Sequence, residues 1–275
     1  MKILTTFFAL IFSFISHASQ ESQFMALESC YGGVNFSTDY MISSIEPKVV
    51  QVDRLKAVKS QGFITLEDAF LDSYIEDDSA YILTHNKIEQ WDLKDLKLIR
   101  TIITHNEPGP YGFDMSPRGF TVYKDKIFVA HNRLGLSVIN KTTGLLIESL
   151  YPHGLAQDVI VQNGQGYVIT HTAEIINGLI LSGITIFDPE THKLGKKTLL
   201  NGAPSSSIDL IGTNFYIGGG FFWELTKKKV DSAKLISSYS RVIMAQLFAQ
   251  GKPFYSQGKI FTCNERRAPM VMPLP

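Results

Sequence analysis

The chain has 275 residues, 44% of them hydrophobic and 19% charged, and its 26 lysine and arginine residues balance its 26 aspartates and glutamates. This composition is typical of a globular protein with a sizeable core and excludes a disordered chain. Because the net charge is zero and the only basic cluster is Lys227–Lys229, the sequence gives no reason to expect nucleic acid or an anionic membrane as a partner.

The first residues have the pattern of a secretory signal peptide. Lys2 supplies a positive start, residues 3–15 form an apolar run, and small residues follow at the end of the segment. We therefore expect residues 1–19 to be removed and residues 20–275 to form one domain of a secreted or periplasmic protein. The apolar run is shorter than the ~20 residues that a membrane-spanning helix needs, so no membrane span is expected.

Further along the chain, self-similar segments recur in which β-forming residues alternate and end in a small or polar group. They recur every 40 to 48 residues, which is the length of one four-stranded propeller blade. Their ranges are 80–85, 127–131, 167–171, 215–219 and 260–264. The sequence therefore predicts about five copies of one structural unit.

The second copy shows the four short strands of this unit in order. Its predicted strands are residues 112–116, 127–131, 135–139 and 145–150, and a turn over 140–144 precedes the last of them. Each strand is too short to stand alone. The pattern is typical of an antiparallel sheet whose strands follow one another along the chain.

The third copy repeats the order with strong turn signals. Asn163-Gly164 separates the predicted strands 158–161 and 167–170, and Asp188-Pro189 follows the strand 183–187. Asn-Gly and Asp-Pro pairs are typical of tight turns. The two copies together indicate a regular succession of hairpins.

The run IFVAHN at 127–132, followed by LSVINKTTGLLIESL at 136–150 and HGLAQDVIV at 153–161, resembles the YVTN-type repeat of β-propeller proteins. Gly109-Pro110 fits the connection that precedes such a repeat. The resemblance covers residues 60–200 best and implies a propeller fold. It implies no single activity, because such propellers serve as surface-layer modules, dehydrogenase subunits, lyases and lactonases.

We expect an all-β fold, a small β-propeller of about five four-stranded blades, because radial repetition buries faces that one blade would expose. The last copy ends too early for a fourth strand. An N-terminal strand at 48–52 is therefore expected to complete the last blade and close the ring. Cys30 and Cys263 lie near the two ends of the mature chain, and a disulfide between them would fasten this seam in an oxidising compartment. Two separate thiols are the alternative.

In a propeller, the connections between blades and the loops after each second strand emerge on one face, around the mouth of the channel. His105 and His153 fall in connections between blades, beside glycine or proline, where functional side chains are commonly held. With Tyr111, Arg133 and an apolar hairpin that contains Glu174, they form the predicted ligand-binding face.

Other polar residues recur once per unit, histidine at the end of the second strand and aspartate near the start of the first. They are His85, His131, His171, Asp68, Asp114, Asp158 and Asp209. Recurrence at one blade position favours a structural role, such as hydrogen bonding to backbone N–H groups. A ring of carboxylates is also suited to calcium or to the acid and base of a glycosidase.

Two functions remain open, and the sequence does not decide whether the protein is an enzyme. The first is an exported interaction module that binds a protein or a glycan at the channel face without a cofactor. The second is a metal-assisted lyase, lactonase or glycosidase at the channel mouth, with a divalent metal. Its residues would be His105, His153, Asp68, Asp114 and Asp158.

Overall fold

The structure is a computed structural model. It describes residues 21–31, 33–55, 60–104, 117–171, 182–200, 207–211, 214–218, 224–231, 234–243, 254–256, 258–263 and 268–273. Across these ranges, no helix has the length and apolar character needed to cross a membrane. Strands make up most of what is described.

The strands form six sheets in the described part of the chain. The first two contain β1 (Val34–Phe36), β2 (Tyr40–Glu46), β3 (Val49–Arg54) and β4 (Ser60–Thr65), then β5 (Phe70–Glu76), β6 (Ser79–Thr84), β7 (Lys87–Asp92) and β8 (Lys97–Ile103). The next two contain β9 (Gly119–Tyr123), β10 (Lys126–Ala130), β11 (Leu136–Asn140) and β12 (Leu146–Leu150), then β13 (Leu155–Gln162), β14 (Gln165–His171), β15 (Ser182–Phe187) and β16 (Leu194–Leu200). The last two contain β17 (Ser207–Ile211), β18 (Asn214–Gly218), β19 (Glu224–Asp231) and β20 (Lys234–Ile243), then β21 (Phe254–Ser256), β22 (Lys259–Cys263) and β23 (Pro269–Pro273).

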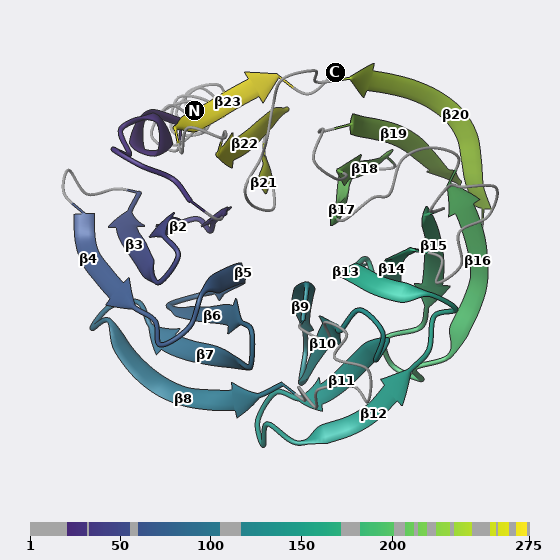
Figure 1. The fold of residues 1–275 in the computed structure, drawn as a ribbon, viewed down its shortest axis with the longest axis horizontal. Coiled ribbons are helices and arrows are strands. Elements are labelled where there is room, and N and C mark those ends of the chain that lie inside the picture. The colour runs from purple at the N-terminus through teal and green to yellow at the C-terminus, as the bar shows by residue number, and fades with distance from the viewer. Residues whose placement is uncertain are drawn as a thin grey trace, which may run out of the picture.

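Within each sheet the strands follow chain order and pair antiparallel with their neighbours. The sheets stand around a common axis, with β5, β9, β13 and β17 innermost and β8, β12, β16 and β20 at the outside (Figure 1). This radial arrangement of antiparallel sheets is that of a β-propeller. It confirms the predicted all-β class and the four-stranded repeating unit.

The core lies between neighbouring sheets, because successive side chains of a strand point to opposite faces. On β6, Ala80 and Ile82 are buried against the first sheet. Tyr81 and Leu83, which alternate with them, are buried against Phe120 of the third sheet. Each central strand therefore contributes to two interfaces, and apolar residues on both faces explain why the strand segments were so easily recognised.

The number of sheets and the closure of the ring differ from the prediction. Residues 48–52, expected in the last blade, belong mainly to β3, which pairs with β2 and β4 in a sheet of its own at the start of the ring. The repeat pattern of the sequence does not extend to this sheet, because β2 contains Ser43 and Ser44 where the other units have apolar residues; both serines are fully buried. The described residues thus form six sheets, the last of them with three strands.

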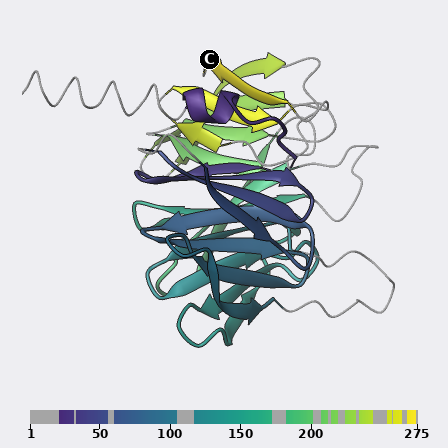
Figure 2. The same cartoon turned by 90° about the vertical axis from the view of Figure 1, so that its left-hand side faces the viewer.

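The N-terminal segment packs at the seam between the first and last sheets. Residues 21–25 form a helical turn, drawn in purple beside β22 and β23 in Figures 1 and 2. Phe24 packs edge-on against Phe261 of β22, with ring centroids 5.6 Å apart, and against Phe36 of β1 at 6.4 Å. Leu27 and Cys30 are buried in the same cluster. In the described residues, the two ends of the chain therefore meet through apolar packing of the N-terminal segment on the last sheet.

Candidate functional site

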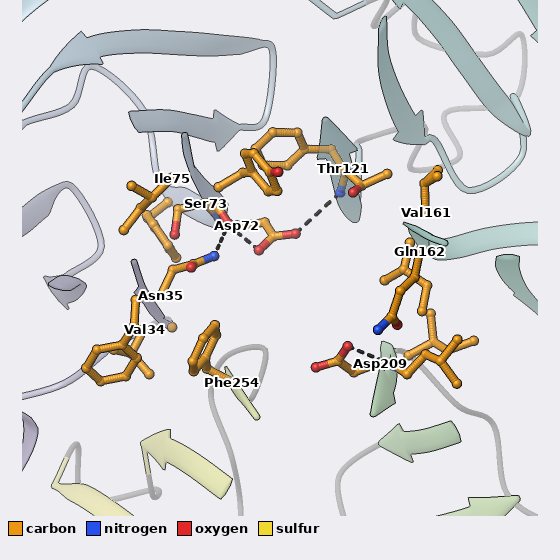
Figure 3. A pocket seen from close by; sticks show the side chains of 18 residues that line it. Val34, Asn35, Asp72, Ser73, Ile75, Thr121, Val161, Gln162, Asp209 and Phe254 are labelled. Carbon is orange, nitrogen blue, oxygen red and sulfur yellow. Dashed lines mark hydrogen bonds between the residues drawn. The ribbon is translucent and has the colours of Figure 1, made fainter. Parts of the chain in front are cut away.

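A cavity of about 350 Å³ lies where the innermost strands converge. Apart from Gly33, which precedes β1, the described residues that line it come from the first strand of every sheet, and Figure 3 labels ten of them. The polar members are Asn35, Asp72, Ser73, Tyr74, Thr121, Gln162 and Asp209. Most of them lie near the middle of their strands, and Tyr74 and Gln162 lie toward the turns that join first and second strands. The sequence had instead predicted the site in the loops at the channel mouth.

Asp72 connects two neighbouring sheets through backbone amides. It follows a β-bulge in β5, which separates the paired residues Phe70 and Asp72. Its Oδ1 accepts the N–H of Ser73 at 2.8 Å, and its Oδ2 accepts the N–H of Phe120, in β9 of the next sheet, at 3.3 Å. The carboxylate is thereby held at the wall of the cavity while its residue is only 6% exposed.

Asp158 repeats this arrangement between the fourth and fifth sheets. It also follows a β-bulge, and its oxygens accept the N–H groups of Val159 and Ile208 at 2.9 Å each. The residue is 1% exposed and does not belong to the described cavity lining. These contacts favour the structural role for this recurring aspartate over the catalytic or metal-binding role considered from the sequence.

Asp209 occupies a different position, although its spacing placed it in the same series. In the fifth sheet the N–H that meets Asp158 belongs to Ile208, as that of Phe120 meets Asp72 in the third. Asp209, the next residue, therefore stands where Thr121 stands in β9. It is half-buried, its Oδ1 accepts the N–H of Leu210 at 2.7 Å, and it lines the cavity. The sequence signal of this departure is the longer interval that separates it from Asp158.

The remaining polar groups of the cavity are amides and hydroxyls. Asn35 Nδ2 donates to the carbonyl oxygen of Ser73 at 2.7 Å, which joins β1 to β5. In the view of Figure 3 the amide of Gln162 is directed toward Asp209. Burial, followed by the nearby Glu76 carboxylate, raises the pKa of Tyr74, so its phenol is neutral at physiological pH. These residues lie on strands, whereas the sequence predicted the site in loops, and they carry no repeat or motif that marks them.

The structure brings together the loops that carry two of the predicted face residues, Arg133 and His153. Asn132 and Ala156 form an isolated antiparallel bridge, with both N–H···O distances 2.8 Å. Asn132 and His153 both have left-handed backbone, with φ of 46° and 56°. Both Arg133 and His153 are exposed. Tertiary contacts therefore fix two left-handed backbone conformations that residues other than glycine rarely adopt.

Side chains of β15 and β16, in the fourth sheet, hold the loop before β13 through hydrogen bonds to its backbone. Thr185 donates its hydroxyl to the carbonyl of Pro152 at 3.1 Å, and Lys197 Nζ donates to the carbonyl of His153 at 2.5 Å. Burial lowers the pKa of the Lys197 ammonium. Tyr151, at the start of this loop, is 64% exposed. Arg133, Tyr151 and His153 thus project from a fixed backbone, and we call them the rim surface.

The structure describes only some of the other predicted site residues. His105, Tyr111, Asp114 and Glu174 lie outside the described residues. Asp68 lies in the connection between β4 and β5, where its Oδ1 accepts the N–H of Ala69 at 2.8 Å. Within the described ranges, no three His, Cys, Asp or Glu side chains are grouped so that they could hold a metal ion.

The three histidines that were aligned in the sequence do not share one blade position. Phe128 and Ala130 of β10 face the fourth sheet, as Tyr81 and Leu83 of β6 face the third. His131 therefore corresponds to Thr84 rather than to the residue after it. It is fully buried, whereas His85 and His171 are partly exposed. The sequence alignment is shifted by one residue because Ala130 and His131 stand in this unit where Leu83 and Thr84 stand in the second sheet.

Comparison with known proteins supports the fold and leaves the function open. No family model and no curated protein matches the chain. One chain in the crystal structure of a mitotic checkpoint complex superposes with a TM-score of 0.66 at 10% sequence identity, covering 86% of this chain and 72% of that chain. With 1191 chains matching in structure, this likeness shows a widespread fold and selects no activity. The resemblance to the YVTN-type repeat stays a prediction.

Proposed function

We propose that the protein is an exported interaction module that binds a protein partner through the rim surface of Arg133, Tyr151 and His153 and catalyses no reaction. The observation that carries the proposal is the fixed backbone beneath these three side chains. Thr185 and Lys197 hold one loop, and the bridge between Asn132 and Ala156 holds the other.

A rigid surface of this composition is suited to protein binding. Tyrosine and arginine are enriched among the residues that dominate binding energy at protein interfaces. Because the backbone of these loops is already held, the propeller would lose little conformational entropy when a partner binds. A similar propeller-containing structure is that of a protein complex, which supports the proposal at the level of the fold alone.

The competing enzyme hypothesis gains no support from the aspartates that are described. Asp158, one of its proposed metal or catalytic residues, is buried and accepts two backbone N–H groups. Asp68 accepts the N–H of its own neighbour. Within the described ranges, neither carboxylate belongs to a group of three His, Cys, Asp or Glu side chains that could hold a metal ion.

Export and a seam disulfide complete the proposal. The signal-like segment at residues 1–19 supports export, although it lies outside the described residues. Cys30 is fully buried in a cluster with Phe261, which is two residues from Cys263. No described cysteine is free. We therefore propose that Cys30 and Cys263 form one disulfide.

The test is capture from the secreted or periplasmic fraction of the producing cells by immobilised mature protein. A triple variant, Arg133→Ala, Tyr151→Ala and His153→Ala, is compared with the wild type. Its control changes three exposed residues in turns that join third and fourth strands, Asp95→Ala, Thr142→Ala and Lys193→Ala. Each captured protein is then purified and its Kd measured against all three forms.

We expect one partner to bind the wild type and the control equally and the rim variant at least about 30-fold more weakly, as loss of hot-spot residues implies. Equal affinity for the rim variant and the control would contradict the rim surface as the binding site. Turnover of a substrate by the mature protein would contradict the proposal that it is non-catalytic.

A further inference from the structure

The outermost strand of the third sheet, β12, is an end strand. Within the described ranges it pairs with β11 on one side and with no strand on the other. It lies at the outside of the ring (Figure 1). The outer side of an end strand presents backbone N–H and C=O groups in alternation, and these are complementary to another extended strand. The backbone of this edge is therefore suited to one kind of partner, a second strand.

The side chains of β12 also favour pairing with another chain. Leu146 and Ile147 are 40% and 47% exposed, and Leu145, just before the strand, is exposed as well. Because successive side chains of a strand point to opposite faces, Leu146 and Ile147 place apolar surface on both faces of the edge. A partner strand would cover both surfaces together. Exposed apolar edges of this kind are sites at which chains associate.

The other outermost strands contain residues that oppose such association. β8, β16 and β20 each contain two cationic residues, β23 contains two prolines, and β4 has a glycine in its interior; they are Lys97, Arg100, Lys196, Lys197, Lys234, Arg241, Pro269, Pro273 and Gly62. Lysine and proline discourage pairing between chains, and an interior glycine weakens a strand. β12 contains none of these residue types. Among the outermost strands of the described sheets, it is thus the one without such protection.

The single charged residue of β12 is engaged with the next sheet. Glu148 Oε2 lies 3.0 Å from Nδ1 of His192, which belongs to the turn between β15 and β16. The Glu148 carboxylate is therefore directed toward the fourth sheet. Ile147, the preceding residue, points to the opposite face of the strand. One face of the edge at the centre of β12 is consequently apolar and uncharged.

A second copy of the same edge is complementary to this pattern. Two identical strands that pair antiparallel are related by a two-fold axis perpendicular to the sheet, so the residue at the axis stands opposite its own copy. With Ile147 at the axis, two β-branched side chains meet, and Glu148 of each copy stands opposite Leu146 of the other. With Glu148 at the axis, two like charges would stand opposite each other, which is unfavourable. The charge pattern thus selects the register centred on Ile147.

We propose that the protein forms a homodimer in which the β12 strands of two copies pair antiparallel about Ile147. Five residues per copy make a short contact, below the roughly 1,000 Å² of stable interfaces, so the dimer is weak and its population depends on concentration. The proposal is independent of the rim surface, because β12 ends before Tyr151. The triple variant of the rim surface should therefore dimerise as the wild type does.

Sedimentation equilibrium of the mature protein, from about 5 to about 500 µM, measures the association, and we expect a monomer–dimer equilibrium with its midpoint in this range. Ile147→Lys should raise the Kd at least about tenfold, because it places two ammonium groups opposite each other. Ile147→Val keeps a β-branched side chain and should change the Kd less than about threefold. Leu199→Lys is the matched control, since it makes the same kind of change at an exposed aliphatic residue of β16.

Hydrogen exchange of the wild type at both ends of this concentration range locates the contact. We expect amides of β12 to gain protection at the higher concentration, while amides of β16 do not. A monomer at every concentration, a dimer unaffected by Ile147→Lys, an equal loss in Leu199→Lys, or protection gained elsewhere but not in β12 would each overturn the proposal. Because exchange is measured on the wild type, it decides the question even if Ile147→Lys does not fold.

Discussion

A bulge followed by aspartate is the device that aligns neighbouring sheets at the level of single residues. Asp158 reaches from β13 to the backbone of β17 and accepts Ile208 N–H, while Gly119 of β9 lies on its other side. A Cβ atom at position 119 would stand 2.2 Å from Asp158 Oδ1. The glycine is needed here for space, because its backbone requires no left-handed conformation.

Replacing Gly119 by alanine should therefore act through Asp158. The carboxylate must move, and the N–H groups of Val159 and Ile208 lose their buried acceptor, which we expect to lower the free energy of unfolding by about 2–4 kcal/mol. In an Asp158→Ala background the nearest remaining atom is the Cα of residue 158 at 3.4 Å, an ordinary contact, and the same change should cost less than about 1 kcal/mol.

Urea unfolding of the wild type, both single variants and the double variant measures this coupling. The pair Gly119→Ala and Asp95→Ala serves as the control, because Asp95 lies in an exposed turn and should be additive with Gly119. Additive effects in the Gly119 and Asp158 cycle would show that the close approach in the structure has no energetic consequence.

These residues also show how far single positions could be predicted. The recurrence of aspartate was visible in the sequence, and its bonding to backbone N–H groups was one of the stated alternatives. Asp68 lies at a regular interval from Asp114 and therefore stood in the predicted series in place of Asp72, four residues later, which makes the contact between sheets. Asp209 stood in the series although its interval from Asp158 is the longest.

At the level of elements, the hairpin turns were the best predicted feature. Asn163 and Gly164, expected as a tight turn, have φ of 53° and 75° and connect β13 to β14. Two consecutive left-handed residues are typical of the type I′ turn, whose twist matches that of the paired strands. Hairpins with such turns can be predicted from the local sequence alone.

At Gly164 there is room for a side chain, but the left-handed backbone would be strained by one. The nearest atom to an added Cβ is the hydroxyl of Tyr123 at 3.9 Å, so the cost of Gly164→Ala comes from the backbone and should be about 1–2 kcal/mol. Gly164→Asn should lose clearly less, since asparagine adopts this conformation more readily. Thermal unfolding of the two variants gives the ranking, and equal losses would argue against a left-handed residue at this position.

The first sheet marks the limit of prediction at this level. β2 and β3 have the lengths and pairing of the other units, but the buried Ser43 and Ser44 interrupt the apolar pattern on which the repeat search depended. Ser44 Oγ donates to the carbonyl of Glu46, so a local hydrogen bond allows one of these polar groups to be buried. In a sequence, a strand that contains such hydrogen-bonded polar residues cannot be distinguished from a loop.

For the whole molecule, closure of the ring is the decisive step, because a propeller with an open seam exposes two sheet faces. The prediction that the strand at 48–52 completes the last sheet is wrong, because β3 pairs with β2 and β4. In the described residues, the N-terminal segment meets the last sheet through the packing of Phe24 on Phe261. An ion pair between Glu21 and Lys259 lies at the same seam. Contacts between chain ends depend on three-dimensional closure and leave no local pattern in the sequence.

The proposed bond between Cys30 and Cys263 should make this seam the redox-dependent part of the molecule. Because it would close nearly the whole chain into a loop, the chain-entropy model gives roughly 4–5 kcal/mol of stabilisation as an upper value. We expect the variant Cys30→Ala with Cys263→Ala to unfold at lower urea concentration than the wild type, and reductant to lower the wild type to the same midpoint. The variant itself should not respond to reductant.

Thiol titration in denaturant without reductant decides whether the bond exists, and two reactive thiols per chain would contradict it. Hydrogen exchange then locates its effect. Because Cys30 is buried with Phe24, Phe36 and Phe261, loss of the bond should speed exchange first in β1 and β22, while β10 and β14 on the far side of the ring keep their protection. A uniform change in exchange around the ring would instead mean that the bond acts on the unfolded chain alone.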